Sequence, residues 1–220
     1  MDLSIIIVSF NTKDLLKRCL ESLPSSLEII VVDNGSTDET VMMLKKVKES
    51  KNKKIKIIEN KENVGFAKAV NQGLKQAEGE YLLLLNSDIF VKDNALEKLI
   101  NFAKDQSQVG VVGGKLINPD GSLQGSCFYL PTISRVVREF WLNGFSFLNK
   151  YAPLGKKPIE VEAIIGAVFL IPKKVLRKVG FFDERYFMYF EDLDYCRRVR
   201  QAGFKVYYLP EAEFSKKKRV

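Results

Sequence analysis

Residues 80–91, EYLLLLNSDIFV, decide the fold of this 220-residue chain, because a buried strand ends there in a cluster of polar side chains. An apolar run this short, bounded by charge, predicts a strand buried on both faces of a parallel sheet, since an exposed antiparallel strand would alternate. Ligands of open α/β sheets bind beyond the carboxyl ends of the strands. Asn86, Ser87 and Asp88 are therefore placed to hold a metal ion and a phosphorylated ligand. In isolation the same tripeptide would indicate an ordinary turn.

Strands alternate with helices through the first half of the chain. β-branched runs predict strands at residues 3–10, 28–33 and 55–60, and helical spacing of apolar residues follows the first of them. A capping-box pattern from Ser36 to Glu39 predicts a helix that runs to about residue 49, and residues 64–77 form the next one. This alternation predicts parallel strands with right-handed crossovers and helices on both faces. The expected fold class is α/β, a three-layer α/β/α arrangement around a central, mostly parallel sheet.

The second half of the chain is less regular. We expect a short strand at 109–113, a turn at 118–121 and a buried strand at 161–171 with Gly166 in its interior, where a ligand can approach closely. A helix at about 191–202 should end at Gly203, and a last strand should cover 205–209. With no low-complexity linker between the halves, the chain is expected to form a single domain.

Composition narrows the class of ligand without choosing one. The net charge of +8 suits phosphorylated small molecules, nucleic acid or an anionic membrane surface. No zinc-ligand spacing or RNA-binding aromatic motif is present, so we expect no nucleic-acid partner. Three widely spaced cysteines indicate reduced thiols. The first strand leaves no room for a signal peptide, and the apolar run 163–171 is too short to span a bilayer. A cytoplasmic protein, with peripheral contact at the inner face of the membrane left open, is expected.

Five segments together resemble family 2 glycosyltransferases of the GT-A fold, within them the rhamnosyltransferase-like group. The segments are LSIIIVSFN, IIVVDNGSTDET, ENVGFAKAVNQGL, YLLLLNSDIFV and GFFDERYFMYFEDLDYCRRVRQAGFKVYYLP. They occur in the family's order and span residues 3 to about 210. The resemblance implies a Rossmann-like GT-A domain in which residues 1–91 bind a nucleotide sugar, residues 92–214 supply the acceptor and catalytic half, and residues 215–220 form a basic tail.

The resemblance implies a set of donor contacts along the first half. They are Ser9, Asn11, Asp33, Gly35, Asn63, Gly65, Lys68, Asn71, Asn86, Ser87 and Gly166. Asp33 is expected to face a pyrimidine base, whose N3–H a carboxylate can accept, although the same residue could simply begin a turn. Lys68 lies where a helix starts and can meet a phosphate, but a solvated helix lysine is an equal alternative.

Asp88 is the metal ligand that the resemblance implies, for Mg²⁺ or Mn²⁺ bridging to the diphosphate. The first acid of the family's D-x-D element is Asn86 here. Asp192 is implied as the catalytic base of an inverting transfer, with Glu191 as the fallback. The alternative is that Glu191, Asp192 and Asp194 only complement the dipole of the helix that they begin.

One departure from the family lies near the end of the chain. The family continues past its last strand to a histidine and a glycine-rich segment, whereas this chain contains no histidine. Either the sequence is a truncated enzyme, or the lysines at 216–218 supply the charge that a metal would give. The implied function is transfer of a sugar from a UDP- or dTDP-linked donor to a saccharide or lipid-linked saccharide, in bacterial cell-wall or surface polysaccharide synthesis.

Three alternatives remain open. The chain could be a catalytically impaired nucleotide-sugar-binding protein or a truncated subunit. A sugar-1-phosphate nucleotidyltransferase shares the layout but needs a glycine-rich, basic loop after the first strand, where Ser9, Phe10 and Asn11 stand. An aromatic and basic segment, with Arg135, Arg138, Phe140, Trp141, Phe145 and Phe147, could lie on an anionic membrane, or form an acceptor-side lid or part of the core.

Overall fold

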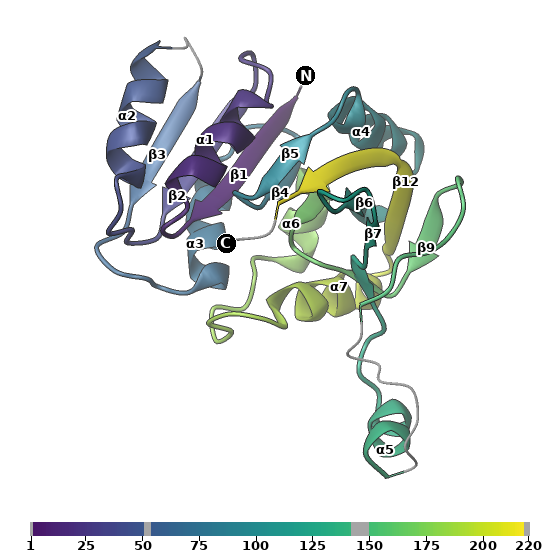
Figure 1. Cartoon of the computed structure of the whole chain (residues 1–220). Helices are drawn as coiled ribbons and strands as arrows, with labels where there is room; N and C mark the ends of the chain where they lie inside the picture. The colour runs from purple at the N-terminus through teal and green to yellow at the C-terminus, as the bar shows by residue number, and fades with distance from the viewer. Residues whose placement is uncertain (1, 51–53, 142–149, 218–220) are drawn as a thin grey trace.

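A mixed β-sheet forms the centre of the molecule (Figure 1). The computed structural model describes residues 2–50, 54–141 and 150–217, and within them the strands run in the order β3-β2-β1-β4-β11-β6-β12-β5. These strands are β1 Leu3–Ser9, β2 Glu28–Asp33, β3 Ile55–Glu59, β4 Tyr81–Leu85, β5 Ile89–Val91, β6 Val109–Ile117, β11 Val168–Pro172 and β12 Lys205–Lys216. Short strands β7 Leu123–Gln124 and β9 Ile159–Val161 pair with β6 and β12, and β8 Cys127–Phe128 pairs with β10 Ala163–Ile164.

The N-terminal strands are parallel, as the alternation of strands and helices predicted. β1 pairs with β2 and β4, and β2 pairs with β3, all in parallel register. Within the stretch 80–91, strand β4 ends before Asn86 as predicted, and residues 86–88 lead the chain on to β5 at the far edge of the sheet. β4 is buried on both faces but has the antiparallel strand β11 as its second neighbour.

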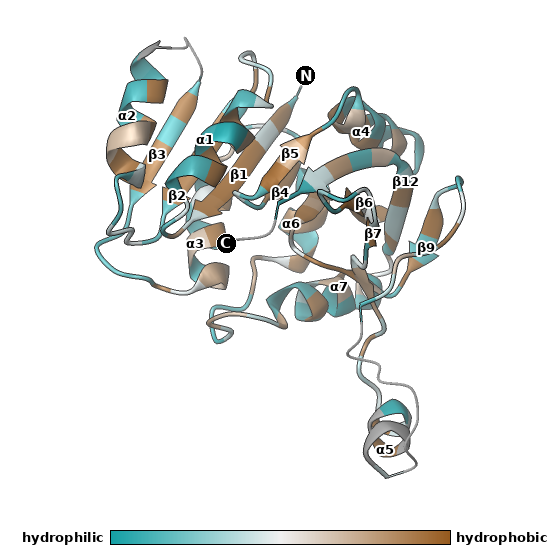
Figure 2. Ribbon diagram, viewed as in Figure 1, coloured by the Kyte–Doolittle hydropathy of each residue, from teal (hydrophilic) through white to brown (hydrophobic). Residues whose placement is uncertain are grey.

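Helices cover both faces of the sheet, which confirms the three-layer α/β/α prediction. Helices α1 Lys13–Glu21, α2 Thr40–Ser50 and α4 Ala95–Asp105 cover one face, and α3 Phe66–Gln76, α6 Lys173–Val179 and α7 Glu191–Gln201 cover the other. Ile5 and Ile7 of β1 belong to the first core, and Ile6 between them belongs to the second. This alternation follows from the two-residue period of a strand. Figure 2 shows the hydrophobic strands enclosed by helices with hydrophilic outer faces.

Four element predictions are corrected. α2 begins at Thr40 rather than within 36–39, because the Asp38 carboxylate accepts the Thr40 N–H while Ser36 Oγ accepts the Asn11 N–H. Residues 161–171 are not one strand, since Gly166 lies in a turn between β10 and β11. β6 and β12 are both longer than expected, and β12 takes Ser215 and Lys216 out of the predicted basic tail. The predicted turn is confirmed, with the Gly121 N–H donating to the Asn118 carbonyl at 2.9 Å.

Helix α5, Ile133–Trp141, projects away from the sheet (Figure 1). The Arg135 guanidinium on it donates to both carboxylate oxygens of Glu162, at 2.6 and 2.7 Å, so one cation of the possible membrane segment forms an ion pair within the protein. Phe145 and Phe147 of the predicted membrane segment lie outside the described residues, as do the side chains of Arg138 and Phe140. Among the helices that the structure describes, none has the length and apolarity needed to cross a bilayer.

Candidate active site

A cleft of about 660 Å³ lies at the carboxyl ends of the parallel strands. It is where an α/β sheet binds its ligands. Residues from both halves of the chain line it, among them Phe10, Asn34, Asn63, Phe66, Asn86, Ser87, Asp88, Lys150, Gly166, Tyr189, Phe190, Glu191, Asp192 and Lys216. The predicted metal ligand and the predicted base therefore share one cleft.

Asp33 lies at the end of β2, is buried and is not among the residues that line the cleft, and its two carboxylate oxygens differ in their contacts. Its Oδ2 accepts the Ser36 N–H at 3.0 Å. Its Oδ1 is buried and has no hydrogen-bond partner among the described residues. A buried acceptor of this kind is costly unless something donates to it, which fits a pyrimidine N–H. Ser9, at the end of the neighbouring strand β1, is also buried, and its hydroxyl lies 2.8 Å from Thr12 Oγ1.

Asn11 and Asn34 shape the loops around this carboxylate. Asn11 has a left-handed backbone (φ +52°), and its Oδ1 accepts the Thr37 N–H at 2.8 Å. Asn34 donates to Asn63 Oδ1 at 2.8 Å and accepts the Val64 N–H at 3.1 Å. Asn34 thus ties the loop after β2 to the loop before α3, a role that the sequence analysis missed. Asn63 lines the cleft, whereas the side chain of Asn11 accepts hydrogen bonds within the loop.

Gly35 and Gly65 are both required by backbone geometry. Gly35 has φ +81°, and a Cβ there would lie 2.6 Å from the Glu62 carbonyl carbon. Gly65 has φ +89°, and a Cβ would lie 2.8 Å from the Phe187 carbonyl oxygen. The Phe66 N–H donates to that same oxygen at 2.7 Å. Gly65, a donor contact that the resemblance implied, is in this structure a point where one part of the chain approaches another, which brings residues near 187 to the start of α3.

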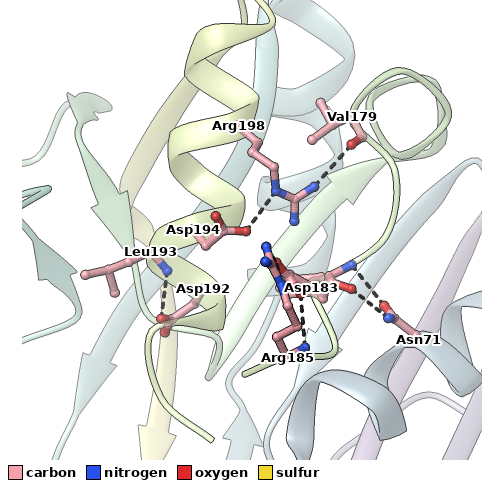
Figure 3. Close-up of polar contacts among 9 residues, drawn as sticks. Asn71, Val179, Asp183, Arg185, Asp192, Leu193, Asp194 and Arg198 are labelled. Atoms are coloured by element: carbon pink, nitrogen blue, oxygen red, sulfur yellow. Dashed lines mark hydrogen bonds and ion pairs between the residues drawn. The ribbon is translucent and has the colours of Figure 1, made fainter. Parts of the chain in front are cut away.

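Lys68 and Asn71 on α3 do not line the cleft. Lys68 is exposed to solvent. Asn71 is buried, and its amide both donates to the Phe182 carbonyl at 2.8 Å and accepts the Phe182 N–H at 3.0 Å (Figure 3). It also donates to the Glu184 carboxylate at 3.0 Å. In this structure Asn71 anchors the loop that precedes α7.

The Asn86-Ser87-Asp88 cluster faces the cleft, as the sequence predicted. All three residues line it, and Ser87 and Asp88 are buried. The Lys216 ammonium from the end of β12 lies 3.9 Å from Asp88 Oδ2. No group of three or more histidine, cysteine, aspartate or glutamate side chains within residues 2–50, 54–141 and 150–217 could hold a metal ion. The buried Asp88 carboxylate at the cleft could supply one oxygen ligand to a cation whose other ligands come from a diphosphate and water.

Glu191 and Asp192 form the first turn of α7 and face the cleft. Burial, and secondly the negative charge of Asp192, raise the pKa of Glu191 to about 7. Burial also raises the pKa of Asp192, against hydrogen bonds to its carboxylate from the Gly166 N–H at 3.0 Å and the Leu193 N–H at 2.8 Å. Carboxylates with a raised pKa are suited to accept a proton near neutral pH.

The rest of the first turn of α7 is structural. Asp194 pairs with Arg198 one turn later, at 2.8 Å, and Arg198 also donates to the Val179 carbonyl (Figure 3). Asp194 thus forms an i,i+4 ion pair within the helix, which is a structural role. Just before the helix, Tyr189 and Phe190 both have a backbone φ of +68°, which residues other than glycine rarely adopt. That turn presents the two aromatic rings to the cleft beside Glu191.

Several cleft residues had no signal in the sequence strong enough to single them out. Phe10, Phe66, Lys150, Tyr189 and Phe190 line the cleft but stand outside the polar patterns that were used. Tyr189 and Phe190 come directly before the Glu191-Asp192 pair in the sequence, so their position next to a predicted base was the available clue. Lys150 lies near the base as well, since its charge acts on Asp192.

Comparisons with known proteins show the family and the fold of this chain. The family model described as "Glycosyl transferase family 2" matches residues 4–180. An N-acetylglucosaminyl-diphospho-decaprenol L-rhamnosyltransferase of Mycobacterium tuberculosis (strain H37Rv) is 28% identical over 232 residues, covering 96% of this chain and 74% of the relative.

Two solved structures share the fold at low sequence identity. Staphylococcus aureus TarS 1-349, in complex with UDP-GlcNAc, superposes with a TM-score of 0.71 at 20% identity. The mannosyltransferase PcManGT of Pyrobaculum calidifontis, in complex with GDP-Man and Mn²⁺, gives a TM-score of 0.69 at 18% identity. The matches cover 100% and 98% of this chain but only 59% and 56% of those chains. The chain therefore has the fold of GT-A glycosyltransferases and spans somewhat more than half the length of these two structures.

Proposed function

This chain belongs to glycosyl transferase family 2, and we propose that it transfers a sugar from a UDP- or dTDP-linked donor to a hydroxyl acceptor with inversion. The observation that carries the proposal is the sharing of one cleft by Asp88 and Asp192. The rhamnosyltransferase relative supports an acceptor of saccharide or lipid-linked saccharide type, in building a bacterial cell-surface polysaccharide.

Asp192 is the proposed catalytic base. An inverting transfer needs one carboxylate to take the acceptor proton while the acceptor oxygen attacks the anomeric carbon from the side opposite the nucleotide. The Asp192 carboxylate is held by the Gly166 and Leu193 N–H groups, so its position is fixed before the acceptor arrives. Glu191, with a pKa of about 7, is the alternative base.

The nucleotide-sugar donor is proposed to lie over residues 1–91. Its pyrimidine base would contact Asp33, and its diphosphate would lie near residues 86–88. Asp33 Oδ1 is the buried acceptor for a uracil or thymine N3–H. Asn63 and Gly166, which line the cleft, complete the proposed donor side. The acceptor would enter from the half formed by residues 92–214, where Tyr189 and Phe190 offer aromatic faces of the kind that bind apolar sugar surfaces.

Mg²⁺ or Mn²⁺ is the proposed cofactor, held by Asp88 together with the diphosphate. Such a cation would neutralise the charge that develops on the leaving nucleotide. Asp88 is buried at the cleft wall, and the PcManGT complex with Mn²⁺ supports a divalent cation at this fold's donor site.

Helix α5 is the proposed point of contact with a membrane. Ile133 and Trp141 are 86% and 82% exposed, and Val137 between them is also exposed, one helical turn from each. An apolar stripe of this kind on a projecting helix suits the interface of a bilayer that carries a lipid-linked acceptor. Co-sedimentation with anionic vesicles should be reduced by Trp141→Ser, and equal recovery of both proteins would contradict the contact.

A thermal-shift screen with UDP-, dTDP- and GDP-sugars, with and without Mn²⁺, tests the proposed donor class. A ligand that binds only the native state raises its stability by mass action. We expect UDP- or dTDP-sugars to raise the Tm and GDP-sugars to leave it unchanged.

A binding protein without activity would give the same shift, so release of UDP or dTDP on incubation with a lipid-linked saccharide separates it from an enzyme. A sugar-1-phosphate nucleotidyltransferase would instead release pyrophosphate from a nucleoside triphosphate.

A further inference from the structure

The end of β12 is fixed beside the Asn86-Ser87-Asp88 cluster by backbone pairing. Lys216 lies opposite Ile89 in the antiparallel pairing of β12 with β5. The next residue, Lys217, donates its N–H to the Asp88 carbonyl at 3.1 Å. A shift in register between Leu209 and Glu213 lets β12 continue past Pro210 to reach this edge. The pairing of β12 within the sheet therefore fixes the backbone position of Lys216 at the cleft.

The side chain of Lys216 is directed at the carboxylate of the cluster. Its Nζ lies 3.9 Å from Asp88 Oδ2, and the two side chains are only 21% and 9% exposed. Lys216, Asn86 and Ser87 line the same wall of the cleft. Charges that are shielded from solvent in this way interact more strongly than they would on an open surface.

The charges of the cleft are divided between its two ends. Its described lining contains the carboxylates of Asp88, Glu191 and Asp192, and the ammonium groups of Lys150 and Lys216. Lys150 acts on Asp192, at the end where the acceptor is proposed to react. Lys216 is the lysine of the Asp88 end, where the diphosphate is proposed to lie.

We propose, on the basis of the proposed function, that Lys216 binds the donor diphosphate directly and gives the chain an affinity for nucleoside diphosphates that does not depend on a divalent cation. An ammonium is a compact point charge with three donors on a flexible stem, so it can reach phosphate oxygens from its place beside Asp88. Because this cation is covalently part of the sheet, it stays in the cleft when no metal is present. A metal held by Asp88 and the diphosphate would add to this binding rather than create it.

Isothermal titration of UDP and dTDP into the full chain in EDTA tests the role of Lys216. Lys216→Met keeps the length of the side chain and removes its charge, and it should weaken binding of the diphosphate roughly tenfold. Binding of the nucleoside alone, uridine or thymidine, should be unchanged. Lys216→Arg keeps the charge and should retain most of the diphosphate affinity.

Lys115→Met is the matched control. Lys115 on β6 forms a 2.8 Å ion pair with Glu213 on β12, the strand that also carries Lys216; it is 32% exposed and does not line the cleft. It should bind UDP and dTDP as the wild type does. Wild-type affinity in Lys216→Met, with a Tm like that of the other variants, would show that Lys216 is only an ion-pair partner of Asp88. Failure of the wild type to bind either nucleotide, with or without Mn²⁺, would instead contradict the proposed function itself.

Discussion

The Gly166 N–H donates a hydrogen bond of 3.0 Å to Asp192 Oδ2. This bond joins the turn before β11 to the first turn of α7, two segments 26 residues apart in sequence. It holds the carboxylate of the proposed base in one orientation, and Gly166 also lines the cleft. The turn therefore positions the base and forms part of the wall of the cleft.

Alanine substitutions at Gly166, which lines the cleft, and at Gly65, at the start of α3, should have unequal effects on stability. A Cβ at Gly166 would meet Phe66 and Asp192 carbon atoms at 3.7 and 3.9 Å, which is ordinary contact, and alanine keeps the N–H. Gly166→Ala should change the free energy of unfolding by less than about 0.5 kcal/mol. Gly65→Ala, with φ +89° and a 2.8 Å approach to Phe187, should cost about 1 to 3 kcal/mol or more. Urea unfolding measures both, and equal losses would mean that the turn at Gly166 is tighter than the structure has it.

Asn71 should matter for folding and not for nucleotide affinity. Asn71→Ala leaves the Phe182 backbone without its buried partner and should cost about 1 to 3 kcal/mol of stability. Gln72→Ala, its neighbour on α3, removes two hydrogen bonds to the partly buried Asn60 and should cost less. UDP binding below the unfolding transition should be unchanged in both variants. Loss of UDP affinity in a stable Asn71→Ala protein would restore the donor contact that the sequence predicted.

Glu191 should make the protein less stable at alkaline pH. Its pKa of about 7 lies above the ordinary 4.5, so the folded state binds this proton more tightly than the unfolded state does. Its contribution is fully present below about pH 4.5 and is lost as the pH rises through 7. Glu191→Gln removes that loss and should gain stability over the wild type between pH 5 and pH 8, approaching about 3 kcal/mol.

The control for this pH effect is Glu97→Gln, at an exposed glutamate of α4. Its stability relative to the wild type should be nearly the same at the two pH values, as is usual for surface substitutions. Urea unfolding at pH 5 and pH 8 gives both comparisons. A Glu191→Gln protein whose relative stability does not change with pH would show that the Glu191 carboxyl is well solvated.

Metal binding should depend on the nucleotide. Because Asp88 lies beside the Lys216 ammonium and no group of three ligating side chains is present in the described ranges, Mn²⁺ alone should bind weakly. Mn²⁺ should tighten UDP or dTDP binding in calorimetry, and Asp88→Ala should abolish that gain. Strong Mn²⁺ binding to the free protein, or nucleotide affinity indifferent to both metal and Asp88, would mean that the 86–88 cluster is misassigned.

The local patterns of the sequence predicted the parallel half of the fold well. Strands such as residues 28–33 are continuous apolar runs, which is the pattern of a strand buried on both faces of a parallel sheet. Gly203 marks the end of α7 through its positive φ. The path of β12 could not be predicted, because Pro210 reads as the end of a strand and only tertiary pairing with β5 carries the chain on to Lys216.

Only part of the candidate site could be predicted, namely the residues whose place follows from the ends of regular elements. Asn86, Ser87, Asp88, Glu191 and Asp192 follow or begin regular elements, so their placement at the cleft follows from topology. The uses of Asn11 and Asn71 depend on which backbone groups lie within hydrogen-bonding distance of their amides, and those groups come from segments distant in sequence. The juxtaposition of Lys216 and Asp88 depends on sheet pairing between distant strands in the same way.

The turnover of Asp192→Asn is the most direct test of the account. The donor is the nucleotide sugar that gives the largest thermal shift, and the readout is release of its nucleotide in the presence of a lipid-linked saccharide. The variant should bind the donor as the wild type does and turn it over roughly two to four orders of magnitude more slowly, the usual contribution of a general base. A parallel Glu191→Gln enzyme distinguishes the two carboxylates. Turnover of Asp192→Asn equal to that of the wild type would contradict the assignment of Asp192 as the base.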